Sequence, residues 1–252
     1  TSSMVNYSTS TYVGWAWKAG GTAVSNTDGT ITSSVSANPT VGFSIVSYTG
    51  TGTAATIGHG LSQAPDMIIL KKRSGIAQWP VGVIQDPMNF TDYMALDKSN
   101  NYADYDYWND TAPTSSVFSL SSNADVNEST GTFISYCFHS VDGYSKVGSY
   151  VGNGNADGPF IYTGFKPAFL IYKNMDSAGT DWGMVDNKRS PSNVLTKYLA
   201  ANEPAAEITN SFGDLVSNGI KIRNIYGGAN TSTNRYLFIA FAETPFKTSN
   251  AR

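Results

Sequence analysis

The sequence predicts an all-β protein made of two tandem homologous β-sandwich units, preceded by an extra strand and a linker. Three observations predict it: a low charged fraction, short apolar runs between turn residues, and an internal repeat. Only 14% of the 252 residues are charged, against roughly a quarter in typical soluble domains. Glycine occurs 24 times, and Ser, Thr and Asn recur in runs. This composition is typical of short strands and tight turns, and it disfavours helix-rich enzymes and coiled coils.

Charge and residue counts exclude several kinds of site. A formal net charge of −3 gives no basic field for nucleic acid. One cysteine, Cys137, rules out an intrachain disulfide, and with only two histidines a Cys/His zinc site is nearly excluded. No apolar run approaches the roughly 18 residues of a membrane span, and no signal-peptide pattern is visible. We expect no metal, cofactor, nucleic acid or membrane insertion. Because position 1 is Thr, we also expect a fragment or processed product.

The internal repeat is the strongest signal in the sequence. Five blocks recur in one order at a shift of 102 or 103 residues: 47–52 with 149–154, 64–71 with 166–173, Trp79 with Trp182, 117–120 with 219–222, and 133–138 with 236–241. Five blocks in nearly one register are hard to obtain by chance. We therefore predict two homologous units, at about 41–142 and about 143–252, each of the size of a β-sandwich.

Short apolar runs rich in Val, Ile, Tyr and Phe predict the strands of the first unit at 43–48, 67–71, 79–84, 117–120 and 133–138. Turn residues such as Thr-Gly-Thr-Gly at 49–52 separate them. The run 133–138 is apolar on both faces, which predicts a strand in the middle of a layered structure. Helical periodicity is almost absent, and only 192–201 and 205–215 are expected to hold a helical turn.

The closing block occurs a third time, at 12–17, where Tyr-Val-Gly-Trp-Ala-Trp has the pattern of 133–138. Residues 1–40 are therefore expected to hold the closing strand of a preceding unit, followed by a Gly-, Ser- and Thr-rich linker or extended arm over 19–38. The alternative is that the strand is borrowed as an added edge strand by one of the visible units. Either way it needs a partner, because an unpaired edge exposes its backbone groups.

The repeat acts as an internal control on single residues. Cys137 aligns with Ala240 and Ala16, which indicates a small packed position rather than a nucleophile. Trp79 and Trp182 coincide, which favours core anchors, with a stacking platform for a sugar as the alternative.

Lys71 and Lys173 also coincide, and each is expected to be a solvated strand end. His59 has no counterpart in the second unit, and His139 aligns with dissimilar residues, as expected of a variable exposed end. No nucleophile-elbow pattern accompanies either histidine. The count of acidic residues leaves a glycosidase pair open, but no spacing points to one.

The loop 100–110 is the candidate ligand-binding segment, because it alternates aromatic rings with Asp and Asn. Rings stack on the apolar face of a pyranose while carboxylates and amides accept hydrogen bonds from its hydroxyls; similar residues are frequent at protein interfaces. The corresponding segment of the second unit, 201–210, lacks aromatic residues, so the fold does not require them. The alternative is that Tyr107 and Trp108 cover the sandwich edge. The candidate residues are Tyr102, Asp104, Tyr105, Asp106, Tyr107 and Trp108.

Two segments rich in Asn and Asp, 123–128 and 153–158, carry oxygen atoms that could bind Ca²⁺. Neither has the spacing of an EF-hand loop. We expect Asx turns instead, because Asn and Asp favour tight local turns.

Four blocks carry a family resemblance. The first joins 12–17 with 27–35 and 42–46, the second is 108–118, the third joins 143–150 with 157–165, and the fourth is Ala-Phe-Ala-Glu-Thr-Pro-Phe-Lys at 240–247. Together they resemble poorly characterised domains in virion proteins of tailed phages, notably marine ones. Such a domain often forms the C-terminal part of a longer tail-fibre-like protein, behind a laminin-G/concanavalin-like sandwich.

The resemblance implies a virion location and a role in host attachment, and it brings no catalytic residues. We predict a non-enzymatic tail-fibre or receptor-binding module that binds a host-surface glycan or outer-membrane component. We expect a homo-oligomer, a trimer, on the tail or particle surface, in contact with other virion proteins and binding through many weak contacts. The alternatives are a purely structural virion protein, as capsid decoration or fibre shaft, and a glycan depolymerase.

Overall fold

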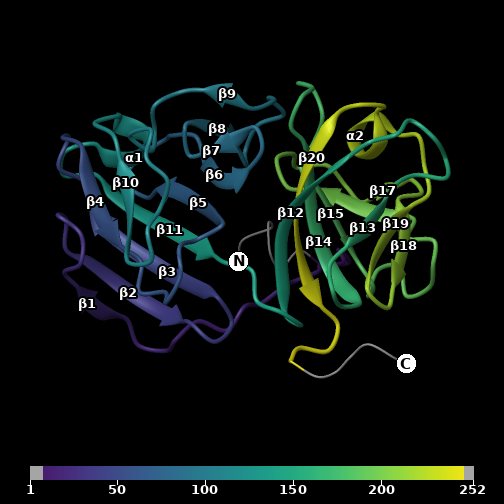
Figure 1. The fold of residues 1–252 in the computed structure, drawn as a ribbon, viewed down its shortest axis with the longest axis horizontal. Coiled ribbons are helices and arrows are strands. Elements are labelled where there is room, and N and C mark those ends of the chain that lie inside the picture. The colour runs from purple at the N-terminus through teal and green to yellow at the C-terminus, as the bar shows by residue number, and fades with distance from the viewer. Residues whose placement is uncertain (1–7, 247–252) are drawn as a thin grey trace.

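The computed structural model describes residues 8–246, and it is all-β, with 41% strand and 3% helix. All pairings between its strands are antiparallel. Figure 1 shows the strands in two groups that lie side by side, β1–β11 and β12–β20. We call these groups the N-terminal half and the C-terminal half. The all-β prediction is confirmed. No helix among residues 8–246 is long and apolar enough to cross a membrane.

The N-terminal half contains a large and a small sheet. The large sheet has the order β1-β2-β3-β11-β5-β6-β8-β9, with β7 beside β6. Its strands are β1 (Val24–Asn26), β2 (Ser33–Asn38), β3 (Phe43–Thr49), β5 (Met67–Lys72), β6 (Pro80–Gln85), β7 (Met88–Asn89), β8 (Asp92–Ala95), β9 (Ala103–Asp104) and β11 (Thr132–Phe138). The small sheet pairs β4 (Ala55–Gly58) with β10 (Val117–Leu120), and the short helix α1 (Ala124–Asn127) follows. All five strands predicted from apolar runs are present.

The C-terminal half also contains two sheets. The larger has the order β12-β20-β14-β15-β16-β17, and the smaller has the order β13-β19-β18. The elements are β12 (Ser145–Val151), β13 (Phe160–Tyr162), β14 (Pro167–Asn174), β15 (Gly183–Asp186), β16 (Lys197–Ala200), β17 (Ile208–Thr209), β18 (Gly213–Val216), β19 (Gly219–Ile222), the short helix α2 (Gly227–Asn230) and β20 (Arg235–Ala242).

The closing strand of each half is central in its large sheet. β11 lies between β3 and β5, with Phe133 opposite Tyr48 on one side and Lys72 on the other. β20 lies between β12 and β14, with Tyr236 opposite Tyr150 and Asn174. Phe133, Tyr48 and Lys72 in the first half and Tyr236, Tyr150 and Asn174 in the second are related by the same shift of 102 or 103 residues as the sequence repeat. The central place of β11 agrees with its apolar residues on both faces.

Apolar side chains form three cores. One lies in the N-terminal half, where Val46, Leu70 and Cys137 of the large sheet pack with Phe118 of the small sheet. The second fills the C-terminal half in the same way, around residues such as Tyr172. The third joins the halves and combines residues of β5, β6 and β8 with residues of β12, β14 and β20. The fully buried Cys137 confirms the prediction of a small packed position.

A buried asparagine at the end of each short helix ties together the loops of its half. The Asn127 side chain accepts a hydrogen bond from the Thr51 amide at 2.9 Å and donates to the Thr53 and Ser121 carbonyls at 2.6 and 3.0 Å. Both amide atoms of this fully buried side chain are therefore satisfied.

The second asparagine, Asn230, occupies the aligned position of the C-terminal half. It accepts from the Asn153 amide at 2.8 Å and donates to the Asn155 and Asn224 carbonyls at 2.8 and 2.7 Å. Nearby, the hydroxyls of Tyr48 and Tyr150 donate to the helix carbonyls of Val126 and Ala229, respectively.

The predicted linker over 19–38 is wrong. Residues 24–26 and 33–38 form β1 and β2, and β2 pairs with β3 along its length. Val35 is 3% exposed and Ile31 is 8% exposed, so the polar segment buries one apolar face. The other face carries exposed Ser and Thr, as is typical of an antiparallel sheet with one face in water, and these residues give the segment its linker-like composition.

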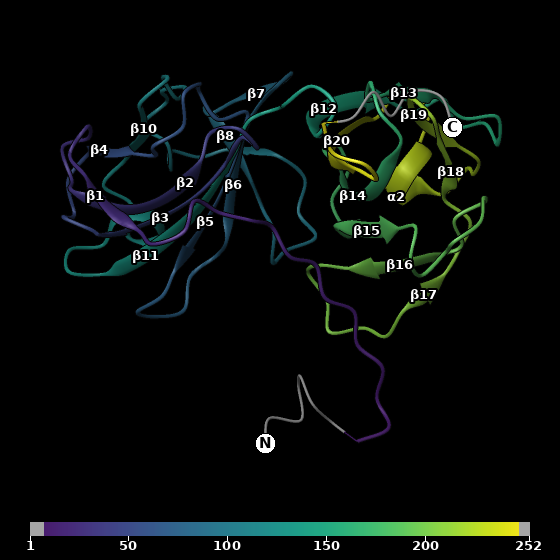
Figure 2. The same cartoon turned by 90° about the horizontal axis from the view of Figure 1, so that it is seen from below.

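The predicted closing strand at 12–17 is also not formed. These residues belong to no strand of the structure. The counterparts β11 and β20, by contrast, each lie between two partner strands. Instead Trp15 and Trp17 pack on Phe169 of the C-terminal half, with ring centroids 5.0 and 5.6 Å apart. Figure 2 shows this segment crossing from the N-terminal half to the C-terminal half.

The helical turns expected in 192–201 and 205–215 are wrong as well. Those segments hold β16, β17 and most of β18, while the two short helices follow β10 and β19.

Two polar residues are buried against expectation. Lys173 is fully buried in β14, where its Nζ donates to the carbonyl and hydroxyl of Thr180 at 2.8 and 2.9 Å. The prediction of a solvated strand end is therefore wrong for Lys173, because the loop after β14 covers its amine. His139 is 4% exposed, and its Nδ1 lies 3.0 Å from the Ser140 carbonyl, so it is not a variable exposed end.

Candidate functional site

The loop 100–110 divides into exposed and buried residues. Asp104, Tyr105 and Asp106 are exposed, and the Tyr105 ring is 48% accessible. Tyr107 is 1% exposed and Trp108 is fully buried, in the core of the N-terminal half. The Trp108 ring packs edge-on against Phe90, with centroids 5.2 Å apart.

The inclusion of Tyr107 and Trp108 among the ligand-binding residues is therefore wrong. A ring without solvent access cannot stack on a sugar, and these two act as core. The physical reason is that the chain passes from β9, at the edge of the large sheet, to β10 of the small sheet, so the end of the loop lies in the core of this half beside Phe90. The alternative, in which these two rings serve the fold by covering the sandwich edge, is right about their structural role, but they lie in the core of the half and not at its edge.

Three tyrosines form the surface that remains. The Tyr105 ring lies 4.8 Å from Tyr107 and 5.7 Å from Tyr93, and Tyr93 meets Tyr107 edge-on at 4.7 Å. Tyr107 forms the buried floor, Tyr93 is half-buried, and Tyr105 is outermost. Packing of two rings against the third limits its motion, and a rigid exposed ring is suited to stacking. We call Tyr93, Tyr105 and Tyr107 the tyrosine cluster.

Polar groups surround the tyrosine cluster. The Tyr107 hydroxyl donates to Asp125 Oδ2 at 2.9 Å, and Asn123 Nδ2 donates to the Tyr105 hydroxyl at 3.2 Å. Burial, followed by this bond to Asp125, raises the pKa of Tyr107 above its usual value, so the phenol stays protonated. Asp125 is half-buried, and Asp104 and Asp106 are exposed. Carboxylates therefore occur within the cluster, at Asp125, and on either side of Tyr105 in the chain.

Sequence reasoning missed Tyr93, Asn123 and Asp125 as members of this surface. Tyr93 belongs to β8, and the other two lie at the start of α1, where Asn123 caps the helix by accepting from the Asp125 amide at 2.9 Å. The capping pattern is visible in the sequence, but the fold alone brings it to the aromatic loop.

Tyr102 lies apart from the tyrosine cluster, at the contact between the halves. Its amide donates to the Met175 carbonyl at 3.0 Å, and the Arg235 guanidinium lies 5.6 Å from its ring centroid. It packs against the core that joins the halves, so its role is in that contact.

Trp79 and Trp182 differ in burial. Trp182 is 2% exposed, and its Nε1 donates to the Ala95 carbonyl of the N-terminal half at 2.8 Å, so it is a core anchor. Trp79 is half-buried, with Lys71 Nζ 3.7 Å from its ring centroid. Lys71 is half-buried too, because it covers that ring.

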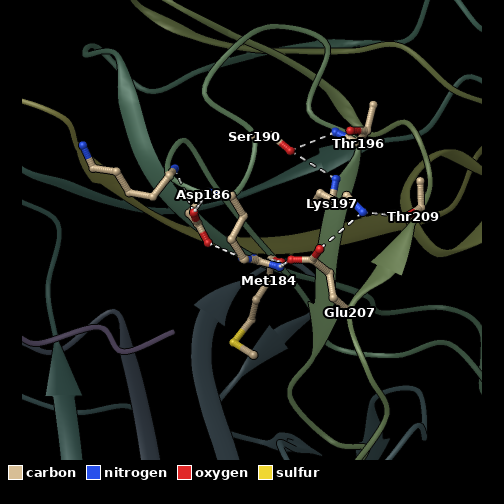
Figure 3. Close-up of polar contacts among 9 residues, drawn as sticks. Met184, Asp186, Ser190, Thr196, Lys197, Glu207 and Thr209 are labelled. Carbon is tan, nitrogen blue, oxygen red and sulfur yellow. Dashed lines mark hydrogen bonds and ion pairs between the residues drawn. The ribbon is translucent and has the colours of Figure 1, made fainter. Parts of the chain in front are cut away.

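A cluster of charged side chains lies in the C-terminal half (Figure 3). Arg189 Nε donates to Asp186 Oδ2 at 2.6 Å, and Arg189 Nη2 donates to the Met184 carbonyl at 2.9 Å. Glu207 lies 3.4 Å from Lys197 Nζ and 3.5 Å from Arg189 Nη1. Each carboxylate is thus matched by a cation.

This charged cluster fixes the loop between β15 and β16. Asp186 Oδ1 accepts from the amides of Lys188 and Arg189 at 2.9 and 2.8 Å, while Ser190 Oγ accepts from two amides after the loop. Burial raises the pKa of the Asp186 carboxyl, but the hydrogen bonds from Arg189 and Lys188 outweigh burial and lower it overall. The role of this charged cluster is therefore structural: it stabilises the conformation of the loop.

The remaining polar candidates are also structural. In 153–158 the Asn155 amide donates to Asn153 Oδ1 at 3.0 Å, and the Asp157 amide donates to Asn155 Oδ1 at 2.9 Å, so the predicted Asx turns are present. His59 is fully buried and accepts from the Leu61 amide at 3.1 Å. Across residues 8–246, no group of three His, Cys, Asp or Glu side chains could hold a metal ion.

Comparison with known proteins gives one match. No curated protein and no solved structure is significantly similar to the chain. Residues 1–245, nearly the whole sequence, match a family described as a domain of unknown function, DUF7483. The chain therefore belongs to the DUF7483 family.

Proposed function

We propose that the chain is a non-enzymatic attachment module of a tailed-phage virion, and that the tyrosine cluster recognises a host-surface glycan. The observation that carries the proposal is the exposed Tyr105 ring, held by two buried or half-buried tyrosines and flanked by Asp104 and Asp106. An aromatic face with acceptors at its rim is suited to a pyranose, which has apolar C–H faces and hydroxyl edges.

The proposal includes two tandem homologous β-sandwich units. Three structural correspondences support it: β11 and β20 have aligned registers, Tyr48 and Tyr150 bond to aligned carbonyls, and Asn127 and Asn230 hold aligned loops. The tyrosine cluster belongs to the first unit alone. The second unit replaces the aromatic loop with 201–210, so recognition is an addition to a repeated scaffold.

Attachment by such a surface depends on valency. One exposed ring and a few carboxylates supply a weak contact, and a homo-oligomer such as a trimer, held in the virion by other virion proteins, multiplies it. The net charge of −3 gives little general attraction to any surface, which leaves recognition to the local contacts.

A second candidate function is a purely structural role in the virion. Phe160 is 47% exposed and Tyr162 is 66% exposed, both on the small sheet of the C-terminal half. Exposed aromatic residues on one strand suit a contact with another virion protein.

Binding of the purified protein to host cells and to a glycan array tests the proposal. Tyr105→Ala should weaken binding about tenfold, the loss of roughly 1.4 kcal/mol of contact free energy. Tyr162→Ala, which removes a still more exposed tyrosine from the other half, is the matched control and should leave binding unchanged. Equal binding by the wild type and Tyr105→Ala would reject the site.

If the wild-type protein binds no host glycan or outer-membrane component, the structural role is favoured instead. Release of reducing sugar from host polysaccharide would contradict the non-enzymatic assignment.

A further inference from the structure

Residues 24–38, which we call the covering segment, close one side of the sandwich in the N-terminal half. Their strand β2 pairs antiparallel with β3 of the large sheet, where Val35 lies opposite Val46. Just before β2, the Ile31 amide donates to the Thr56 carbonyl of β4, in the small sheet, at 3.1 Å. The side chains of Ile31 and Val35 are buried in the core of this half. One extended segment therefore contacts both sheets and covers the core between them.

The C-terminal half has the same two edges without a covering segment. β12 aligns with β3 at a shift of 102 residues, and β13 pairs with β19 as β4 pairs with β10. In the chain from residue 8 to 246, β12 ends the large sheet of this half and β13 ends the small one. Only residues 139–144 separate β11 from β12, which is too short a connection to hold a counterpart of the covering segment.

The outer side of β12 carries backbone groups that can pair with a further strand. The Val147 amide donates to Ser140 Oγ at 3.1 Å, so it points away from the neighbouring strand β20. Amides that point to one side alternate along an antiparallel strand, so those of Ser149 and Val151 point outward as well. Both residues are exposed, and in the described part of the chain no strand lies beside them. Such an edge is a template for strand addition.

β12 and β13 lie side by side (Figure 2), and a groove of about 380 Å³ runs between them. Gly148 and Phe238 line the groove on the side of the large sheet. A Cβ atom at Gly148 would lie only 2.7 Å from the Phe238 ring, so the glycine leaves room for that ring. Phe160 and Tyr162, which are 47% and 66% exposed, line the groove on the side of β13. Exposed aromatic rings beside an open strand edge mark a contact site.

The groove also indicates which residues its occupant carries. Gly148 aligns with Val46, which lies opposite Val35 of the covering segment. The occupant's residue opposite Gly148 therefore faces the Phe238 ring, which favours an apolar side chain. Lys146 lines the groove two residues earlier and is exposed, and no ion pair involving it is found among residues 8–246. In an antiparallel occupant this lysine lies toward the C-terminal end, where an acidic residue complements its charge.

We propose that the open edge of β12 binds an extended segment of a partner protein, which adds to the sheet as an antiparallel strand. The segment is identified by its chemistry: an apolar residue opposite Gly148, followed closely by Asp or Glu beside Lys146. Backbone hydrogen bonds to Ser149 and Val151 supply affinity, and the groove supplies the preference for sequence. The inference rests on the correspondence between the tandem units proposed above and is independent of glycan recognition.

A labelled peptide with the sequence of residues 28–40 is the probe, because that segment covers the equivalent edge of the N-terminal half. The chain's own copy is tethered beside that edge and competes there at high effective concentration, so the free peptide should bind at β12. Fluorescence anisotropy should show saturable binding, and the same peptide with Ala37→Glu should bind up to about fivefold more tightly at low salt. A scrambled peptide should not bind. Amide hydrogen exchange at Ser149 and Val151 should slow when the peptide is added.

Three variants of the full chain locate the site. Ser149→Pro removes an outward amide but no hydrogen bond to β20, so it should fold, as urea unfolding can check, and should no longer bind the peptide. Phe160→Ser combined with Tyr162→Ser removes two exposed rings and should weaken binding severalfold without altering stability. Lys146→Gln should abolish the preference for the glutamate peptide, whereas Lys188→Gln, at another exposed lysine of the same half, is the control and should retain it.

Failure of both peptides to bind, or equal binding by the wild type and the variant that lacks Phe160 and Tyr162, would overturn the proposal. A stable dimer of the chain that excludes the peptide would also overturn it, because a second copy would then be the occupant. So would peptide binding that appears only in a chain shortened to residue 246, because the chain's own end would then occupy the groove. No readout involves a glycan, so failure here and failure of the attachment function are separate results.

Discussion

The aligned asparagines Asn127 and Asn230 provide a quantitative test of the proposed tandem units. Asn127→Ala deletes one acceptor and two donor interactions, which join the side chain to Thr51, Thr53 and Ser121. A buried polar group left without its partner costs about 1–3 kcal/mol. Thr51 and Thr53 are exposed, so water replaces part of the loss. We expect Asn127→Ala to lower the free energy of unfolding by about 2–4 kcal/mol.

Asn230→Ala removes the bonds to the Asn153 amide and to the Asn155 and Asn224 carbonyls, and one further bond, from Asn230 Nδ2 to Asn153 Oδ1 at 3.1 Å. If the units are homologous and the asparagines equivalent, its cost should agree with that of Asn127→Ala within about 1 kcal/mol, the usual context dependence of such bonds. Asn89→Ala is the control, because Asn89 is exposed in β7, and it should change stability by less than about 0.5 kcal/mol.

Urea unfolding of the three variants and the wild type, followed by tyrosine and tryptophan fluorescence, gives these differences. A cost below 0.5 kcal/mol for either buried asparagine, or a large cost for one and none for the other, would refute the equivalence.

Three further predictions concern single buried residues. Trp108→Ala should cost about 3–5 kcal/mol of unfolding free energy, against under about 1 kcal/mol for Tyr105→Ala; equal costs would mean that the two rings are not divided between core and surface. Burial lowers the pKa of Lys173 from 10.5 to about 8, so the folded state binds the proton less tightly than the unfolded state. Between pH 8 and 10.5 the wild type should therefore gain up to about 3 kcal/mol relative to Lys173→Met as pH rises, and a pH-independent difference in urea unfolding would contradict this. Burial raises the pKa of the Cys137 thiol to about 12, so a disulfide reagent at neutral pH should label the protein only after unfolding; rapid labelling of the native protein would show that the site opens.

The strands predicted from apolar runs are present because each run carries its own signal of β-branched and aromatic residues. The segments for which the prediction is wrong, 19–38, 192–201 and 205–215, lack this local signal. β2 reads as a linker since only alternate residues such as Val35 and Ala37 face inward, and its other face is Ser and Asn. The segments around β16 and β17 are strands because they extend an existing sheet, and such pairing overrides weak local propensity.

The candidate site was predicted in part. The alternation of Asp and Tyr in 100–110 correctly places Tyr105 on the surface. It could not separate Tyr105 from Trp108, because burial depends on the strands that the loop crosses. Likewise, the block at 12–17 has the pattern of a strand but belongs to no strand of the structure, whereas β11 has a strand on each side. A periodic pattern specifies which faces are apolar, while the neighbours decide whether a strand forms.

The proposed virion role is tested most directly by looking for the protein on a virion. An antibody against the purified chain is coupled to gold and applied to intact virions of the tailed phage that the proposal takes as the source, and electron microscopy locates the gold. The account predicts gold at the tail fibres, with the same antibody blocking adsorption of the virion to host cells. Gold on the capsid alone, or virions that carry no label, would contradict it.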